Sequence, residues 1–223
     1  MNEPTPTRPV LGPWHRHDAS LDDALAFVNT LEFSGQGSRE ELATGFDLLA
    51  WLRERGLIHA ETVDGSPPRP GANEHAASSL LERARSLRTA FREVIEAVAE
   101  HRPAPRAALD RINDALRHSP GYEVVPAPAG VVLEHRHAAD EPEGGLASLA
   151  AALVDGIVEG RPERLKVCAN DQCRWVFQDV SPTGRRKWCD MTSCGNRAKA
   201  RRHRERRRVG TAGPSLPARS TPA

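Results

Sequence analysis

The sequence lacks any long apolar run. Its longest weakly polar stretch, residues 146–154, is far shorter than the roughly 20 residues that a membrane-spanning helix needs. Residues 1–17 hold four prolines and two histidines, and they contain neither the apolar core of a secretory signal nor a transit-peptide pattern. We therefore expect a soluble cytoplasmic protein that is not exported and has no membrane partner.

Cysteine is absent outside one short segment. All four cysteines fall within 27 residues in the order C-x4-C-x15-C-x4-C, as Cys168, Cys173, Cys189 and Cys194. Four thiolates in two close pairs suit the tetrahedral coordination of Zn²⁺. Two disulfides would need an oxidising compartment, for which no targeting signal is seen. The pattern predicts one structural zinc, with disulfides and an iron–sulfur cluster as the alternatives.

Net charge is nearly absent, at +1, but the charges are unevenly distributed. Residues 1–160 hold 15 Lys/Arg and 25 Asp/Glu, whereas residues 161–223 hold 16 and 5, so the two parts carry −10 and +11. An acidic body joined to a basic tail is expected when only the tail meets a polyanion. The alternative is that the two parts attract each other.

Apolar periodicity predicts that residues 19–160 are mostly helical. The first helix follows an N-cap at Ser20 and runs for about three turns, to Leu31. The second follows a capping box formed by Ser38 and Glu41 and ends before Gly56. We expect three further helices, over about residues 73–98, 106–118 and 145–159.

Extended structure is predicted in one place within this domain. The β-rich runs 122–125 and 131–137 flank a Pro-Ala-Pro-Ala-Gly segment and predict an antiparallel hairpin. The expected fold class is therefore mainly α (α+β), with this hairpin in a helical domain over residues 19–160 and a zinc module over residues 161–209. Proline-rich or small polar segments predict a flexible lead over 1–18, a surface loop over 65–71 and a disordered tail over 210–223.

The segment between the cysteine pairs has the pattern of a zinc-ribbon-like hairpin. Residues 174–179 alternate like a strand, residues 181–184 form a turn, and residues 185–189 can return as the partner strand. A module this small needs the metal to stabilise it, and we expect Trp175, Phe177 and Trp188 to form an apolar cluster beside the ion. Base stacking is the alternative role for these aromatic side chains.

A basic helix is predicted after the last cysteine. Gly195 and Asn196 are suited to start it, and residues 196–208 contain almost nothing apolar, so this helix cannot be packed in a core. Basic side chains spaced four, three and four residues apart share one face, which could follow a phosphate backbone; a merely solvated face is the alternative. The predicted nucleic-acid-binding residues are Asn196, Arg197, Lys199, Arg201, Arg202, Arg204 and Arg208, with the first two as weak candidates for reading bases.

Residues 194–197, Cys-Gly-Asn-Arg, resemble the CGNR zinc fingers, which are named for that tetrapeptide. The resemblance covers about 35 residues, although residues 182–185 depart from the usual turn. The residues that carry it are Cys168-Ala-Asn170, Cys173, Trp175, Phe177, Asp179, Ser181, Arg186 to Cys189, Met191 and Cys194 to Arg202.

Residues 25–30, 48–57 and 87–88 are similar, more weakly, to the ABATE domain found in stress-induced transcription regulators. Together the two resemblances imply a bacterial transcription regulator whose finger binds DNA. They also imply a helical domain that senses a small-molecule effector or forms a homodimer.

Two polar residues interrupt apolar helical stretches, and they are candidates for an anion-binding pocket: Asn29 and Arg88. The alternative is that each is a buried group satisfied by hydrogen bonds within the protein.

The function predicted first is a DNA-binding regulator. An RNA-binding or protein-binding zinc module is the alternative, because arginines contact phosphates without distinguishing the sugar. An enzyme in residues 20–160, using Asn29, Arg88 or histidines such as His135 and His137, is the third. We expect no enzyme, since no P-loop, paired-carboxylate or nucleophile–base signature stands out and a four-ligand zinc leaves no open position for water.

Overall fold

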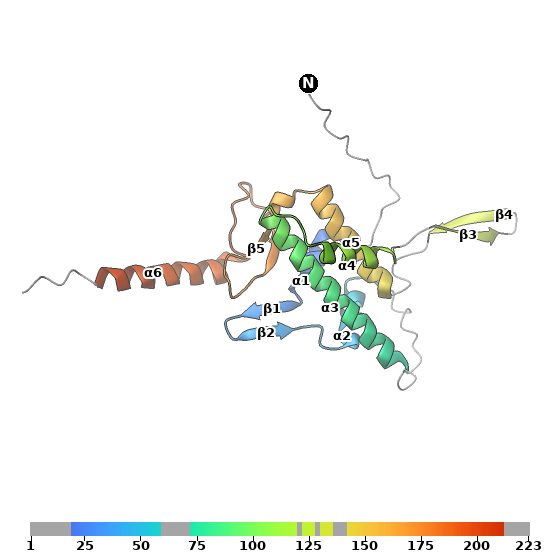
Figure 1. Cartoon of the computed structure of the whole chain (residues 1–223), viewed down its shortest axis with the longest axis horizontal. Helices are drawn as coiled ribbons and strands as arrows, with labels where there is room; N and C mark the ends of the chain where they lie inside the picture. Colours follow the sequence, from blue (N-terminus) through green and yellow to red (C-terminus); the bar gives the residue numbers. More distant parts are fainter. Residues whose placement is uncertain (1–18, 59–71, 120–121, 128–129, 136–141, 212–223) are drawn as a thin grey trace, which may run out of the picture.

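The computed structural model describes residues 19–58, 72–119, 122–127, 130–135 and 142–211. Within these ranges the chain forms a helical body with small two-stranded sheets at its edges, and one helix projects away from it (Figure 1). None of the described helices is long and apolar enough to cross a membrane. The lead 1–18, the loop 65–71, Pro120 and Gly121, His137 and the tail from residue 212 lie outside the described residues.

Helices α1 (Leu21–Asn29), α2 (Gly45–Glu54), α4 (Arg106–Leu116) and α5 (Pro142–Val158) surround the long helix α3 (Ala72–Ala99), which contacts each of them. Three aromatic rings join α1, α2 and α3: the Phe27 ring lies 5.8 Å from that of Phe91, edge to face, and 5.7 Å from that of Trp51. Both phenylalanine side chains are fully buried. The predicted helices over 73–98, 106–118 and 145–159 are confirmed.

The predicted start of the second helix is wrong. Ser38 lies in a strand, and the capping box is formed by Thr44, whose amide donates to the Asp47 carboxylate at 2.7 Å while the Asp47 amide donates to the Thr44 hydroxyl at 3.2 Å. Two capping-box patterns stand six residues apart, and the first of them pairs in a hairpin instead. Phe46, in the first turn of this helix, is 51% exposed.

The first helix is also shorter than predicted, because α1 ends at Asn29 and Leu31 begins a strand. Strands β1 (Leu31–Ser34) and β2 (Gly37–Glu40) form a hairpin that the sequence did not predict. The predicted hairpin is present as β3 (Tyr122–Ala127) and β4 (Gly130–His135), paired antiparallel with Tyr122 opposite His135. The N-terminal part thus carries two hairpins where one was expected.

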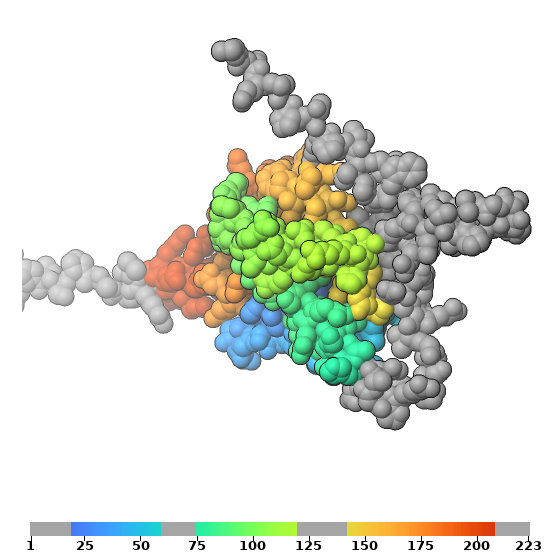
Figure 2. All heavy atoms as spheres, turned by 45° about the vertical axis from the view of Figure 1, so that its right-hand side comes forward, coloured from blue at the N-terminus to red at the C-terminus, as the bar shows by residue number. Residues whose placement is uncertain are grey.

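The zinc module contains a hairpin, but its strands differ from the prediction. Strand β6 (Val176–Gln178) pairs antiparallel with the preceding strand β5 (Leu165–Val167), and residues 185–189 form no strand. Leu165 and Val176 are buried in the same apolar core as the helical body. In the space-filling view the module (orange) adjoins the N-terminal segment (blue) and the end of α3 (Figure 2).

Helix α6 (Asn196–Thr211) follows a π-helical turn, η4 (Met191–Gly195), and points away from the body (Figure 1). It starts where predicted, but it includes Gly210 and Thr211, which were assigned to the tail.

Candidate zinc centre and nucleic-acid interface

The four cysteine sulfurs converge on one point. Their Sγ atoms all lie within 4.8 Å of one another, with Cys189 Sγ 3.7 Å from Cys173 Sγ and 3.8 Å from Cys194 Sγ. A tetrahedral ion with Zn–S bonds of about 2.3 Å requires sulfurs separated by about 3.8 Å. A disulfide requires about 2.05 Å, and all four cysteines are free. The donor set and its spacing therefore fit a structural zinc held by four thiolates.

The first two ligands lie in a tight loop between β5 and β6. The Cys168 amide donates to the Trp175 carbonyl at 2.8 Å, and the Cys173 amide donates to the Asn170 carbonyl at 2.7 Å. The next residue, Arg174, has a left-handed backbone with φ of 50°. This conformation is uncommon for a residue with a side chain, so it marks a place where the surrounding contacts fix the backbone.

The second pair of ligands lies at the ends of a segment organised by Asp190. Its carboxylate accepts hydrogen bonds from the Ser193 amide at 2.7 Å and the Thr192 hydroxyl at 2.5 Å, and its carbonyl accepts from the Gly195 amide at 3.0 Å. Asp190 therefore caps the turn that leads into α6, a role expected of Asn196. The Asn196 side chain instead donates to the Thr192 carbonyl at 3.0 Å.

The pKa values of the cysteine thiols indicate how metal binding and ionisation are linked. Burial raises the pKa of Cys173 to about 11 and also raises that of Cys189. Burial opposes ionisation of Cys194 as well, but a hydrogen bond from the Asn170 side-chain amide to its sulfur at 3.5 Å contributes to a lowered pKa. Without a cation Cys173 and Cys189 are therefore held as thiols, and metal binding is coupled to proton release.

Asp179 explains why residues 185–189 return without forming a strand. Its buried carboxylate accepts hydrogen bonds from the Arg186 amide at 2.8 Å, the Ser181 amide at 3.0 Å and the Lys166 ammonium at 2.9 Å. Hydrogen bonding by Ser181, Lys166 and the Arg186 amide holds the pKa of Asp179 well below its usual range. Hydrogen bonds to the Asp179 side chain thus hold the returning segment, which was expected to be held by strand pairing.

The predicted aromatic cluster is divided between two environments. Phe177 is buried, with the Arg186 guanidinium 4.9 Å from the centre of its ring. Trp175 and Trp188 are half-buried and line hollows on the surface beside the cysteines. Neither tryptophan is therefore fully enclosed in a core.

Asn29, predicted to line a pocket, instead holds the zinc module to the helical body. Its side-chain amide donates to the Val176 carbonyl at 2.9 Å, and the Val176 amide donates to Asn29 Oδ1 at 3.0 Å. This buried side chain occupies the edge of β6 that β5 leaves unpaired, as the peptide group of a third strand would. Asn29 is thus a buried group whose hydrogen bonds are satisfied within the protein, which was the alternative to a pocket residue.

Arg88 is likewise occupied by protein groups. Its guanidinium contacts both carboxylate oxygens of Glu40, at 2.7 and 2.5 Å, and donates to the Thr30 hydroxyl at 2.8 Å. These contacts anchor the β1–β2 hairpin to α3. Neither Arg88 nor Asn29 lines the hollows beside the zinc cluster or the hollow among α3, α4 and α5.

Sequence reasoning also missed contacts between α3 and the zinc module. The Arg92 guanidinium donates to the Arg174 carbonyl at 2.7 Å and the Val28 carbonyl at 3.1 Å, and Glu96 pairs with the Arg174 side chain at 2.6 Å. Burial lowers the pKa of Arg92 to about 10, so this arginine stays charged at neutral pH. The apolar periodicity of α3 gave no signal for these contacts.

The basic side chains of α6 are accessible. Among residues 196–207 only Ala198 is buried, and the predicted residues Asn196, Arg197, Lys199, Arg201, Arg202 and Arg204 are all exposed. Arg208 lies on the helix, but its side chain is outside the described part of the structure. The first turns of α6 also border a hollow of about 200 Å³, the finger groove, lined by Asn170, Gln172, Trp188, Cys194, Arg197, Ala198, Arg201 and Arg204.

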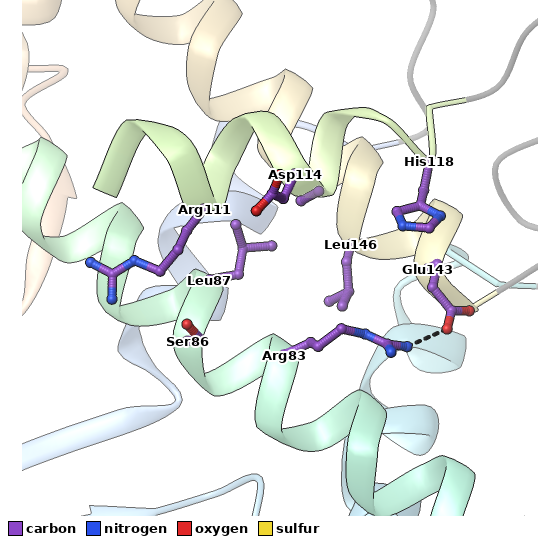
Figure 3. Close-up of a pocket in the computed structure, with 9 residues that line it drawn as sticks. Arg83, Ser86, Leu87, Arg111, Asp114, His118, Glu143 and Leu146 are labelled. Atoms are coloured by element: carbon purple, nitrogen blue, oxygen red, sulfur yellow. Dashed lines mark hydrogen bonds and ion pairs between the residues drawn. The ribbon is translucent and has the colours of Figure 1, made fainter. Parts of the chain in front are cut away.

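A second hollow of about 200 Å³, the helical-domain hollow, lies among α3, α4 and α5 (Figure 3). Leu87 and Leu146 form part of its apolar lining, and an ion pair between Arg83 and Glu143 lies at its edge. Arg111 lines it from α4 and pairs with Glu93 at 2.6 Å.

Comparison with known families agrees with this arrangement. The CGNR zinc finger model matches residues 164–207, which include all four cysteines, so the cluster is a structural zinc site. The ABATE model, described as "putative stress-induced transcription regulator", matches residues 22–160. No curated protein matches the chain. The chain therefore belongs to the ABATE family and carries a C-terminal CGNR zinc finger.

Proposed function

We propose that this protein is a transcription regulator that binds DNA through α6. The observation that carries the proposal is a helix with exposed basic side chains on all sides, beginning directly after a zinc ligand. Such a surface neutralises phosphates, and the cation that holds Cys194 fixes where the helix starts.

The charge distribution supports the same proposal. Residues 1–160 carry −10 and would repel a polyanion, whereas residues 161–223 carry +11. The helix leaves the body and contacts mainly η4, and its basic side chains over residues 197–207 are exposed (Figure 1). The proposal assigns no reaction to the chain, because four thiolates leave a zinc no open position.

Salt dependence of DNA binding tests this function. The logarithm of the binding constant should fall against the logarithm of salt concentration with a slope near −0.9 for each phosphate contacted. Replacing Arg197, Arg201 and Arg204 together by alanine should make the slope shallower by up to about three such units. Cys173→Ala should lose both zinc and DNA retention. A slope near zero for the natural protein would reject DNA binding, and tighter binding to structured RNA in competition would favour the RNA-binding alternative.

The helical-domain hollow is the place that we propose for an effector. An apolar floor with arginines at its edge suits a small amphipathic carboxylate, and benzoate is a simple probe. The exposed Ser86 lines this hollow, so Ser86→Trp fills it without changing a buried residue. Benzoate should raise the melting temperature of the natural protein but not that of Ser86→Trp. Equal shifts in both proteins would contradict this assignment.

A further inference from the structure

The finger groove joins the basic helix to the loop that carries the first zinc ligands. Its α6 wall is formed by Arg197, Arg201 and Arg204, which lie at spacings of four and three residues and so share one face. Along the helix axis these positions span about 10 Å, at 1.5 Å per residue. The same groove has an aromatic wall, Trp188, which is half-buried.

The opposite face of α6 is equally basic but does not border the finger groove. Lys199, Arg202 and Arg206 are exposed, and they lie roughly half a turn away from the face that borders the groove. The two faces therefore offer the same number of cations on the same helix. They differ in whether they border the finger groove.

Gln172 lines this groove beside the β1–β2 turn. Its side chain makes no hydrogen bond to any described residue, although its backbone amide donates to Asn170 Oδ1 at 3.4 Å. The β1–β2 turn lies against it: a Cβ built on Gly35 would be 2.8 Å from Gln172 Oε1. The atoms that such a Cβ would meet are the end of the exposed Gln172 side chain, so this side chain lies close to the turn.

We propose that DNA binds in the finger groove, with its backbone on the Arg197, Arg201 and Arg204 face and with Gln172 as a base-reading side chain. A glutamine amide has the donor and acceptor needed to pair with an adenine edge. Arginines on one face hold the phosphates and set the register in which that amide meets a base. This inference rests on the proposed DNA-binding function and adds which surface binds.

Charge substitutions test the groove. Gln172→Glu should weaken binding of a duplex DNA probe several-fold at low salt and Gln172→Lys should strengthen it, because a charge in the groove meets phosphates directly. Thr183→Glu and Thr183→Lys are the matched controls, since Thr183 is exposed on the same finger but does not line the groove. They should change binding by less than half as much.

The two helix faces provide the second comparison. Alanine at Arg197, Arg201 and Arg204 should weaken binding at least tenfold more than alanine at Lys199, Arg202 and Arg206. Equal losses from the two triple variants, or equal effects at positions 172 and 183, would overturn the groove while leaving DNA binding intact. Failure of the unaltered protein to bind DNA would instead overturn the proposed function.

Selection of bound sequences from random DNA tests the base contact. Gln172→Ala should relax the preference for adenine at one position and leave the remaining preferences in place. An unchanged selected sequence would overturn the role of Gln172. Zinc content measured on each variant confirms that the finger remains loaded, so that a change reflects the groove and not the fold.

Discussion

Asn29→Ala should separate the zinc finger from the helical body. In the native protein the Asn29 side chain satisfies both the amide and the carbonyl of Val176, at 3.0 and 2.9 Å, in a buried position. Alanine removes both partners at once, and β5 cannot replace them, because the side chain occupies the edge of β6 away from β5. The perturbation therefore acts on the contact between two parts of the chain and leaves the zinc ligands in place.

The expected cost follows from the two orphaned backbone groups. Each buried group left without a partner costs about 1–3 kcal/mol, so the free energy of unfolding should fall by about 2–6 kcal/mol. That is a large share of the roughly 5–15 kcal/mol that stabilises a typical domain. Asn113→Ala is the matched control, since Asn113 is an exposed helical residue on α4 and its loss should cost less than about 0.5 kcal/mol.

Two signals should be followed during urea unfolding of the zinc-loaded chain: release of zinc to a coloured chelator and loss of helical circular dichroism. The natural protein should show one coincident transition, because Leu165 and Val176 belong to the same core as the body helices. Asn29→Ala should release zinc at a lower urea concentration than that at which the helices unfold. If Asn29→Ala and Asn113→Ala unfold alike, the amide does not hold the finger and this reasoning is wrong.

Three further predictions concern the helical body. Thr44→Ala should lower the free energy of unfolding by about 0.5–2 kcal/mol in thermal denaturation, whereas Ser38→Ala should lower it by less than about 0.5 kcal/mol. The reverse order would support the capping box at Ser38 that the sequence predicted. Burial alone would raise the pKa of the Glu40 carboxyl, but the ion pair with Arg88 leaves that pKa lowered. The contribution of ionised Glu40 to the free energy of unfolding should therefore be complete above pH 4.5 and be lost as the pH falls below it. Arg88→Met should cost about 1–3 kcal/mol at pH 7 and abolish that dependence in acid unfolding curves. Phe46→Ser should change the melting temperature little, as its side chain is half exposed; a large drop would contradict that placement.

The features predicted correctly from the sequence are those set by neighbouring residues. The zinc ligands were found because two close cysteine pairs need little chain to converge, and α3 and α4 because an apolar period over several turns has few alternatives. Ser38 and Thr44 carry equivalent capping patterns, and only the pairing of Ser38 opposite Phe33 decides between them. Local pattern alone could not make that choice.

The features that were missed depend on residues far apart in the chain. Asn29 and Val176 are 147 positions apart, so the sequence could not show that they bond to each other. Asn29 was therefore assigned to a pocket, whereas it holds the zinc module to the helical body. The partner of β6 was misassigned because one buried carboxylate, Asp179, replaces a ladder of backbone hydrogen bonds. The spacing of residues along the sequence does not indicate that a side chain will take the place of a paired strand.

Helix α3 links these separate observations. Leu87 lies on it in the wall of the helical-domain hollow, and one or more turns further along Arg92 and Glu96 hold the backbone and side chain of Arg174. Arg174 directly follows a zinc ligand, has a left-handed backbone and is held by those contacts. Because tightly packed groups move together, we expect a shift of α3 to reach the finger through them. A ligand in that hollow would therefore contact the same helix that holds the finger.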